Sequence, residues 1–115
     1  MLKIPKGRGD EAARSSAILF AALGDQKRLW LVSRLCSDGP ASITRLATGA
    51  RITRQAVTKH LRVMERAGLV RSARRGRERL WQLEQQRLEE ACRYLNQISA
   101  QWDKALERLR ALVET

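Results

Sequence analysis

The chain has 115 residues, of which 43% are hydrophobic and 30% charged, and its 23 Lys or Arg outnumber 12 Asp or Glu to give a formal net charge of +11. This composition predicts one folded domain with a modest core rather than a disordered chain. It excludes a membrane-spanning protein, since no window approaches about 18 successive apolar residues. The start of the chain lacks the apolar segment of a secretory signal, so we expect a cytoplasmic protein.

The polar residues do not form the pattern of a catalytic or metal site. Cys36, Cys92 and His60 are too few for a zinc site of the usual type, and the seven glycines are too scattered for a phosphate-binding loop. The dispersed acids allow no Ser–His–acid or paired-carboxylate arrangement. We therefore expect no enzyme, no metal and no cofactor. Two cysteines do not make a disulfide framework, and we expect both thiols to be reduced and to lie on apolar helix faces.

The first third of the chain predicts an arm and two helices. Residues 1–9 are basic, contain Gly and Pro, and are expected to form a flexible arm before a single domain over residues 10–115. Acidic residues in the first turn favour a helix over 10–23. Asp25 is a good N-cap for a second helix, whose expected core face recurs at steps of three and four residues. That face comprises Leu29, Val32, Leu35 and Cys36.

Two further helices follow, and the second is strongly basic. Ser42 can cap a short third helix, and Thr53 can cap a fourth that runs to about Ala67 and stops at Gly68. The fourth helix should pack through Val57, Leu61 and Met64, while its opposite stripe is wholly polar. Two helices joined by a short turn, the second with a basic and amide-bearing outer face, form the helix-turn-helix pattern. The polar stripe is Gln55, Thr58, Lys59, Arg62 and Arg66.

A β-hairpin is predicted next, with strands over 69–73 and 79–83 around a Gly-containing turn at 74–78. A hairpin directly after such a helix is the wing of a winged helix. Residues 51–79 as a whole carry ten Arg or Lys and two acids, a net charge of +8, as expected of a protein that lies against phosphates. The hairpin arginines suit phosphate contacts or insertion into a narrow minor groove. They are Arg74, Arg75, Arg77 and Arg79.

The last predicted helix, over about 86–113, is long and nearly neutral. Its apolar residues step by three and four throughout, and about 28 residues would span roughly 42 Å. That length exceeds so small a domain and would leave part of the apolar stripe exposed, so we expect a two-fold dimer that covers it. The expected interface residues are Leu19, Phe20, Leu95, Ile98, Trp102, Leu106 and Leu109.

Three motifs in this order, LFAALGDQKRLWLVSRL, RITRQAVTKHLRVMERAGLV and RSARRGRERLWQL, resemble the ArsR/SmtB family of bacterial winged-helix repressors over roughly residues 17–112. The resemblance implies a mainly α winged helix-turn-helix with five helices, a two-stranded wing and a homodimer formed by the terminal helices. It also implies binding to double-stranded DNA at an inverted-repeat operator. Metal-sensing members carry Cys-x-Cys in the third helix or histidine ligands on the last. In the third helix this chain has Ala47-Thr48-Gly49, and its last helix contains no histidine. Metal sensing therefore does not carry over, and the effector is unknown.

The sequence therefore predicts a DNA-binding transcriptional regulator that acts as a repressor. Residues near the start of the fourth helix, Arg54, Gln55 and Thr58, are favoured for base contacts. An architectural or RNA-binding module is the first alternative, but it would need stacking aromatics and none lies on this face. A redox- or persulfide-sensing repressor using Cys36 and Cys92 is the second. The expected DNA-binding residues are Thr53, Arg54, Gln55, Thr58, Lys59, His60, Arg62, Arg74, Arg75, Arg77 and Arg79.

Overall fold

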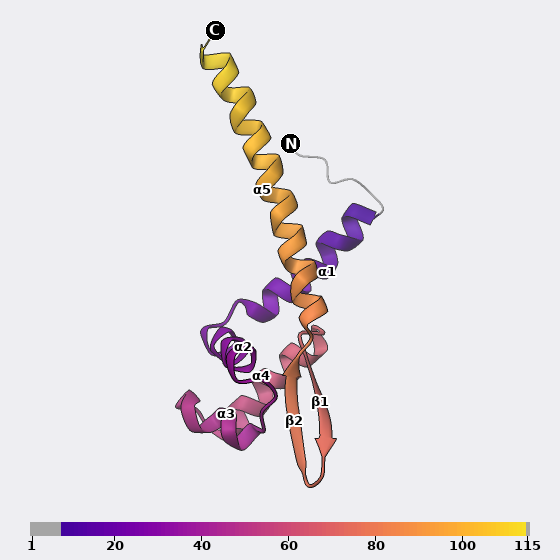
Figure 1. Cartoon of the computed structure of the whole chain (residues 1–115), viewed down its shortest axis with the longest axis vertical. Helices are drawn as coiled ribbons and strands as arrows, with labels where there is room; N and C mark the ends of the chain where they lie inside the picture. Colours follow the sequence, from indigo (N-terminus) through magenta and orange to yellow (C-terminus); the bar gives the residue numbers. More distant parts are fainter. Residues whose placement is uncertain (1–7, 115) are drawn as a thin grey trace.

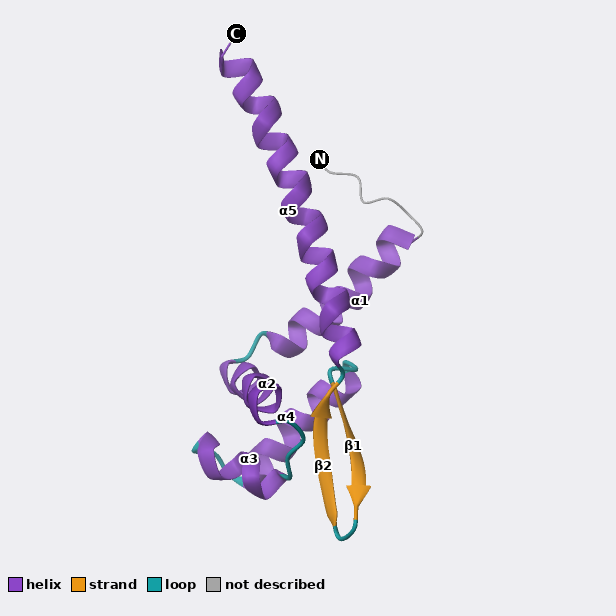
Figure 2. Cartoon of the chain, viewed as in Figure 1, coloured by secondary structure: helices purple, strands orange, loops and turns teal. Residues whose placement is uncertain are grey.

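The structure, a computed structural model, describes residues 8–114, and over these residues the chain forms five helices and one antiparallel hairpin (Figures 1 and 2). This order confirms the predicted winged helix-turn-helix fold. The first helix begins at Arg8, two residues earlier than expected, and the rest of the expected arm, residues 1–7, lies outside the described residues. The elements are α1 (Arg8–Leu23), α2 (Gln26–Asp38), α3 (Ile43–Ala50), α4 (Arg54–Arg66), β1 (Val70–Arg75), β2 (Glu78–Leu83) and α5 (Gln85–Glu114).

Three of the helices begin at the predicted N-caps. The Asp25 carboxylate accepts hydrogen bonds from the backbone amides of Lys27 and Arg28, at 2.9 and 3.1 Å. Ser42 and Thr53 each accept from the amide three residues further on. These bonds satisfy amides that have no partner within the helix. The amide of Arg28, with its guanidinium charge acting in the same direction, lowers the pKa of Asp25 below its ordinary value.

One hydrophobic core lies between α1–α4 and the base of the hairpin. Val57, Leu61 and Met64 of α4 are fully buried in it, as predicted. The predicted core face of α2 is partly wrong, because Leu29 is 49% exposed and Cys36 is also exposed. Helix α2 contacts α1, α3, α4 and β2, so its buried surface is not a single stripe. The other large buried side chains are Leu19, Leu31, Leu35, Leu46, Leu69 and Trp81.

The hairpin has a tighter turn than the sequence predicted. The ladder runs from Val70 opposite Leu83 to Arg75 opposite Glu78, which leaves a two-residue turn in place of five. Gly76, the first turn residue, has φ +66°, and tight hairpin turns of this kind favour glycine because it adopts positive φ without steric cost. The longer strands carry the turn away from the helices (Figure 1).

The base of the hairpin is attached to the loop between α2 and α3. Ala41 and Trp81 exchange two backbone hydrogen bonds, of 3.0 and 2.9 Å. Trp81 is 1% exposed, so it is a packing residue of the core. The wing is thus fixed at one end by the core and free at its tip.

Helix α5 packs on α1 near its own start and then runs on alone (Figure 1), so that the molecule measures 67 × 30 × 21 Å. Its outer half carries a row of exposed apolar side chains. No helix within residues 8–114 is long and apolar enough to span a membrane. The exposed residues on this half are Leu95, Ile98, Trp102, Leu109, Leu112 and Val113, between 46% and 78% exposed.

Two of the expected interface residues differ from this exposed row. Leu19 is only 1% exposed and belongs to the core of its own subunit. Phe20 is half-buried against that core. Apolar residues cover most sides of α1 between Ile18 and Leu23, so periodicity alone does not show which of them packs inside the subunit.

Candidate nucleic-acid interface

The outer face of α4 is polar and open to solvent. Its cap residue Thr53 is exposed, and so are Arg54, Gln55 and Lys59. The opposite face is held in the core by Val57 and other fully buried residues. Burial of that face fixes the rotation of the helix, and therefore the direction in which its polar side chains point.

Thr58 and His60 are half-buried and already have partners within the chain. The Thr58 hydroxyl donates to the carbonyl of Arg54 at 2.9 Å, so it faces a ligand with its lone pairs rather than its proton. The Nδ1 atom of His60 accepts from Arg28 of α2 at 3.3 Å. This nitrogen joins α2 to α4, and only the Nε2 side of the imidazole is left for a phosphate.

Arg62 extends from α4, which as the second helix of the helix-turn-helix is its recognition helix, toward the wing. Its Nη1 atom is 3.1 Å from Glu65 Oε1 in an exposed ion pair. Its guanidinium carbon is 5.6 Å from the centre of the Trp81 ring, within the range of a cation–π contact. Arg62 therefore spans α4 and β2, a position that the sequence stripe did not indicate.

The four predicted wing arginines are all exposed. Arg74 and Arg79 are opposite each other in the ladder, and alternation along the strands puts them on the same face as Trp81. Arg79 also donates to the Ser72 hydroxyl at 2.8 Å, which holds its guanidinium along the strands. Arg75 is opposite Glu78, and Arg77 lies in the turn.

A groove runs between the wing tip and the start of the helix-turn-helix. Arg54 lines one side of it, Arg77 and Arg79 line the other, and its volume is about 250 Å³. Three cations around one open groove concentrate positive potential where a phosphodiester backbone could lie. The structure thus brings together residues that are 23 to 25 positions apart in the sequence.

Four further residues of the same groove were not predicted as contacts: Ser42, Ile43 and Thr44 at the start of α3, and Glu78 of β2. The sequence pattern indicated Ser42 only as a helix cap. A rule that the first helix of a helix-turn-helix crosses the DNA backbone would have indicated these hydroxyls. Glu78 is the one acidic residue among those that line the groove.

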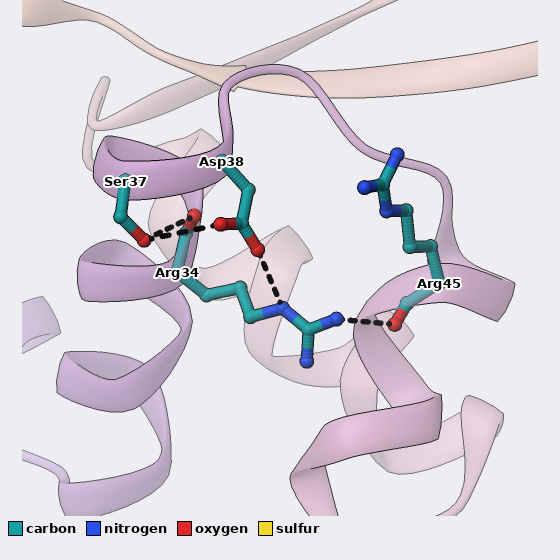
Figure 3. A network of polar contacts seen from close by, with 4 residues as sticks. All are labelled: Arg34, Ser37, Asp38 and Arg45. Atoms are coloured by element: carbon teal, nitrogen blue, oxygen red, sulfur yellow. Dashed lines mark hydrogen bonds and ion pairs between the residues drawn. The ribbon is translucent and has the colours of Figure 1, made fainter.

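Helix α3 is held against α2 by Arg34 (Figure 3). The Arg34 guanidinium donates to Asp38 Oδ2 at 3.0 Å and to the Arg45 carbonyl at 3.3 Å. It also covers the Trp30 ring, at 5.3 Å from the ring centre. A side chain on Gly49 would collide with this guanidinium, so any other residue at this position would displace the Arg34 side chain.

The remaining candidate chemistry is limited. Cys36 and Cys92 are free and exposed, which corrects the expectation that both pack on apolar faces. Cys36 lines a hollow of about 440 Å³ together with Leu88, which is one helical turn before Cys92. No cluster of three or more His, Cys, Asp or Glu side chains suited to a metal ion occurs within residues 8–114.

Comparisons with known proteins agree with this geometry. A helix-turn-helix domain family model matches residues 23–73. An uncharacterised HTH-type transcriptional regulator of Bacillus subtilis (strain 168), YuzN, is 41% identical over an alignment of 68 residues that covers 54% of this chain and 74% of that protein.

Among solved structures, an ArsR-like transcriptional regulator from Rhodococcus sp. RHA1 superposes with a TM-score of 0.80 at 32% identity, over 89% of this chain and 95% of that one. The homodimeric winged helix-turn-helix DNA-binding domain of a possible ArsR-family regulator from Mycobacterium bovis superposes with a TM-score of 0.63 at 20% identity, over 94% of this chain and 95% of that one. The second likeness concerns the fold alone. With a basic recognition helix, a basic wing and these relatives, the chain belongs to the ArsR family of winged helix-turn-helix transcriptional regulators.

Proposed function

We propose that this regulator is a repressor that binds an inverted-repeat operator as a homodimer. The observation that carries the proposal is the groove in which Arg54 of the recognition helix faces Arg77 and Arg79 of the wing. A duplex seated there would place the start of α4 in the major groove and the wing tip along the adjacent backbone.

The exposed residues of the interface have different roles in this proposal. Arg54 and Gln55 read base edges, because they lie in the first turn of α4 and their side chains form bidentate hydrogen bonds with guanine and adenine, respectively. Lys59 and the wing arginines hold phosphates. Arg62, with Glu65 and Trp81 as partners, contributes its free donors to a phosphate at the edge of the site.

The dimer is supported by the outer half of α5. Leu95, Ile98, Trp102 and Leu109 are between 46% and 64% exposed. They follow steps of three and four residues, as do helices that pair along an apolar seam. In the proposed dimer Leu106 joins this seam and Phe20 of α1 borders it, whereas Leu19 is excluded by its burial.

The two-fold axis gives the proposal a defined operator. One recognition helix reads too few base pairs to select a site in a genome. Two helices related by a two-fold axis would lie one turn of DNA apart, about 34 Å, and would read half-sites whose centres are about ten to eleven base pairs apart. Repression would follow if such a site overlaps a promoter.

Salt dependence and competition together test this function. Duplexes selected from a random library by the whole protein provide the operator, and scrambled duplexes provide the competitor. We expect log K to fall with log salt with a slope of roughly −5 to −9, as for about six to ten phosphates per dimer. A slope flatter than about −2 would show that the basic face is not the binding surface. Equal affinity for selected and scrambled duplexes would favour an architectural module instead.

A second candidate function, a thiol-based sensor, is favoured by the exposure of both cysteines. Solvent-accessible thiols are open to oxidation or persulfide formation. The test compares operator affinity before and after a mild disulfide-forming oxidant, in the native protein and in Cys36→Ser and Cys92→Ser variants. A loss of operator affinity on oxidation that occurs only in the protein with both cysteines would support the sensor. Unchanged operator affinity on oxidation would contradict it.

A further inference from the structure

Helix α1 packs on both α4 and α5 (Figure 1), and a hydrogen bond joins the start of α5 to Ala67, the C-cap residue of α4. This junction connects the DNA-reading helix to the two helices of the proposed dimer seam. A single side chain, Arg87 of α5, contacts all three elements. Its side chain is 22% exposed.

Helix α4 ends in a way that leaves one carbonyl for this arginine. The Leu69 amide donates to the Met64 carbonyl at 2.9 Å and the Gly68 amide donates to the Glu65 carbonyl at 3.0 Å. This is the Schellman pattern, with Gly68 at φ +79°. The carbonyl of the C-cap residue Ala67 instead accepts from Arg87 Nε at 3.2 Å. The negative end of the α4 dipole also stabilises a cation at this position.

The other edge of the same guanidinium holds α1. Arg87 Nη1 donates to the Ser15 hydroxyl at 2.6 Å, and Nη2 donates to the Ser15 carbonyl at 3.1 Å. Glu90, one turn further along α5, accepts from Nη1 at 3.0 Å and keeps the arginine extended. The guanidinium is planar and rigid. Its hydrogen bonds therefore hold the Ala67 carbonyl at a set position relative to the hydroxyl and the carbonyl of Ser15.

We propose that Arg87 is a positioning residue through which the α1–α5 pair sets the orientation of the recognition helix. This inference rests on the proposed function, since it assigns to Arg87 the link between the subunit seam and DNA reading. Ala67 lies 13 residues after Arg54, about 20 Å along the helix axis. Arg87 therefore acts on the operator only through α4, and not as a phosphate contact.

The test uses the whole protein with Arg87→Met, Arg87→Lys and a matched control, Arg93→Met, which removes an exposed arginine six residues along the same helix. Dimer dissociation is followed by sedimentation, and binding is titrated with the selected operator and with a scrambled duplex. Hydrogen bonds to a charged group are each worth roughly tenfold or more in an equilibrium constant. We expect Arg87→Met to weaken operator binding by at least about tenfold, with the dimer and the affinity for scrambled duplex unchanged.

Two readouts separate positioning from a general loss of structure or charge. The salt slope of Arg87→Met should equal that of the native protein, whereas loss of a phosphate contact would flatten it by about two per dimer. Amides in the last turn of α4 should exchange hydrogen faster while those of α2 are unchanged. Arg87→Lys keeps the charge but not the planar donors, so it should restore little of the lost affinity.

A double-mutant cycle with Ser15→Ala completes the test. If Arg87 acts through Ser15, adding Ser15→Ala to Arg87→Met should cause no further loss of operator affinity. Native-like operator affinity in Arg87→Met, or equal losses for operator and scrambled duplex, would overturn the inference. A native protein that neither dimerises nor selects a duplex would instead overturn the proposed function, whatever the Arg87 variants do.

Discussion

At the scale of single residues, side chains from one polar stripe of α4 face different surroundings. Gln55 and Lys59 are exposed, whereas Arg62 lies over the Trp81 ring. His60, which lies outside the stripe, accepts a hydrogen bond from Arg28. The stripe itself could be read from the sequence, because it depends only on helical periodicity. These partners could not, because they come from α2 and β2, which meet α4 only in the folded chain.

Replacement of Gln55 by alanine tests base reading. A bidentate contact to a base is worth about 1–3 kcal/mol of discrimination, so Gln55→Ala should weaken operator binding by that amount and leave scrambled duplex nearly unaffected. Arg77→Ala, the comparison variant in the wing, should weaken both duplexes and flatten the salt slope by about two per dimer. Anisotropy titrations at several salt concentrations measure both effects. If Gln55→Ala weakens binding to both duplexes equally, Gln55 contacts the DNA backbone and not a base.

At the scale of helices and strands, local signals were reliable where one side chain decides a boundary. Asp25, Ser42 and Thr53 cap the helices that they were expected to cap. Local signals failed where packing decides, since Leu29 fits the periodicity of α2 and yet is 49% exposed. The exchange of hydrogen bonds between Ala41 and Trp81 had no sequence signal either, because it joins residues 40 positions apart.

The glycine that ends α4 allows a direct test of one such boundary. Gly68 has φ +79°, and a residue with a side chain pays about 1–2 kcal/mol in this conformation. Gly68→Ala should therefore lower the free energy of unfolding by that amount in urea titrations. Gly24→Ala is the control, because its φ lies outside the left-handed region, and it should change stability by about 0.5 kcal/mol or less. Similar losses for both variants would contradict this role of Gly68.

At the scale of the whole molecule, the outer half of α5 has apolar side chains that are largely exposed in the subunit. Trp102 is 64% exposed, and truncation of a buried interface tryptophan often costs more than 2 kcal/mol. Trp102→Ala should shift the dimer toward monomer by at least that amount in sedimentation equilibrium and lower operator affinity with it. Far-ultraviolet circular dichroism of the monomer should retain most of the helix. Gln101→Ala, on the neighbouring exposed position, should leave the dimer intact. A monomer that binds a full operator tightly would contradict the dimer.

The whole chain is also expected to be indifferent to metals. Zinc, cadmium or arsenite at micromolar concentration should leave operator affinity within roughly twofold, because the sequence lacks ligand sets of usual spacing. Titration of the protein–operator complex with each metal measures this. A tenfold release of DNA that a chelator reverses would contradict it.

The open edge of the hairpin has a further consequence for the free protein. β2 pairs with β1 on one side and, at Trp81 only, with Ala41 on the other. No strand within residues 8–114 pairs with the outer side of β1. An exposed strand edge is a template for intermolecular sheet formation and aggregation. Arg74 and Arg75 belong to β1, and their charges would repel the β1 edge of a second copy of the chain. The cations that we expect to neutralise DNA phosphates would, in the absence of DNA, keep one wing from adding to another.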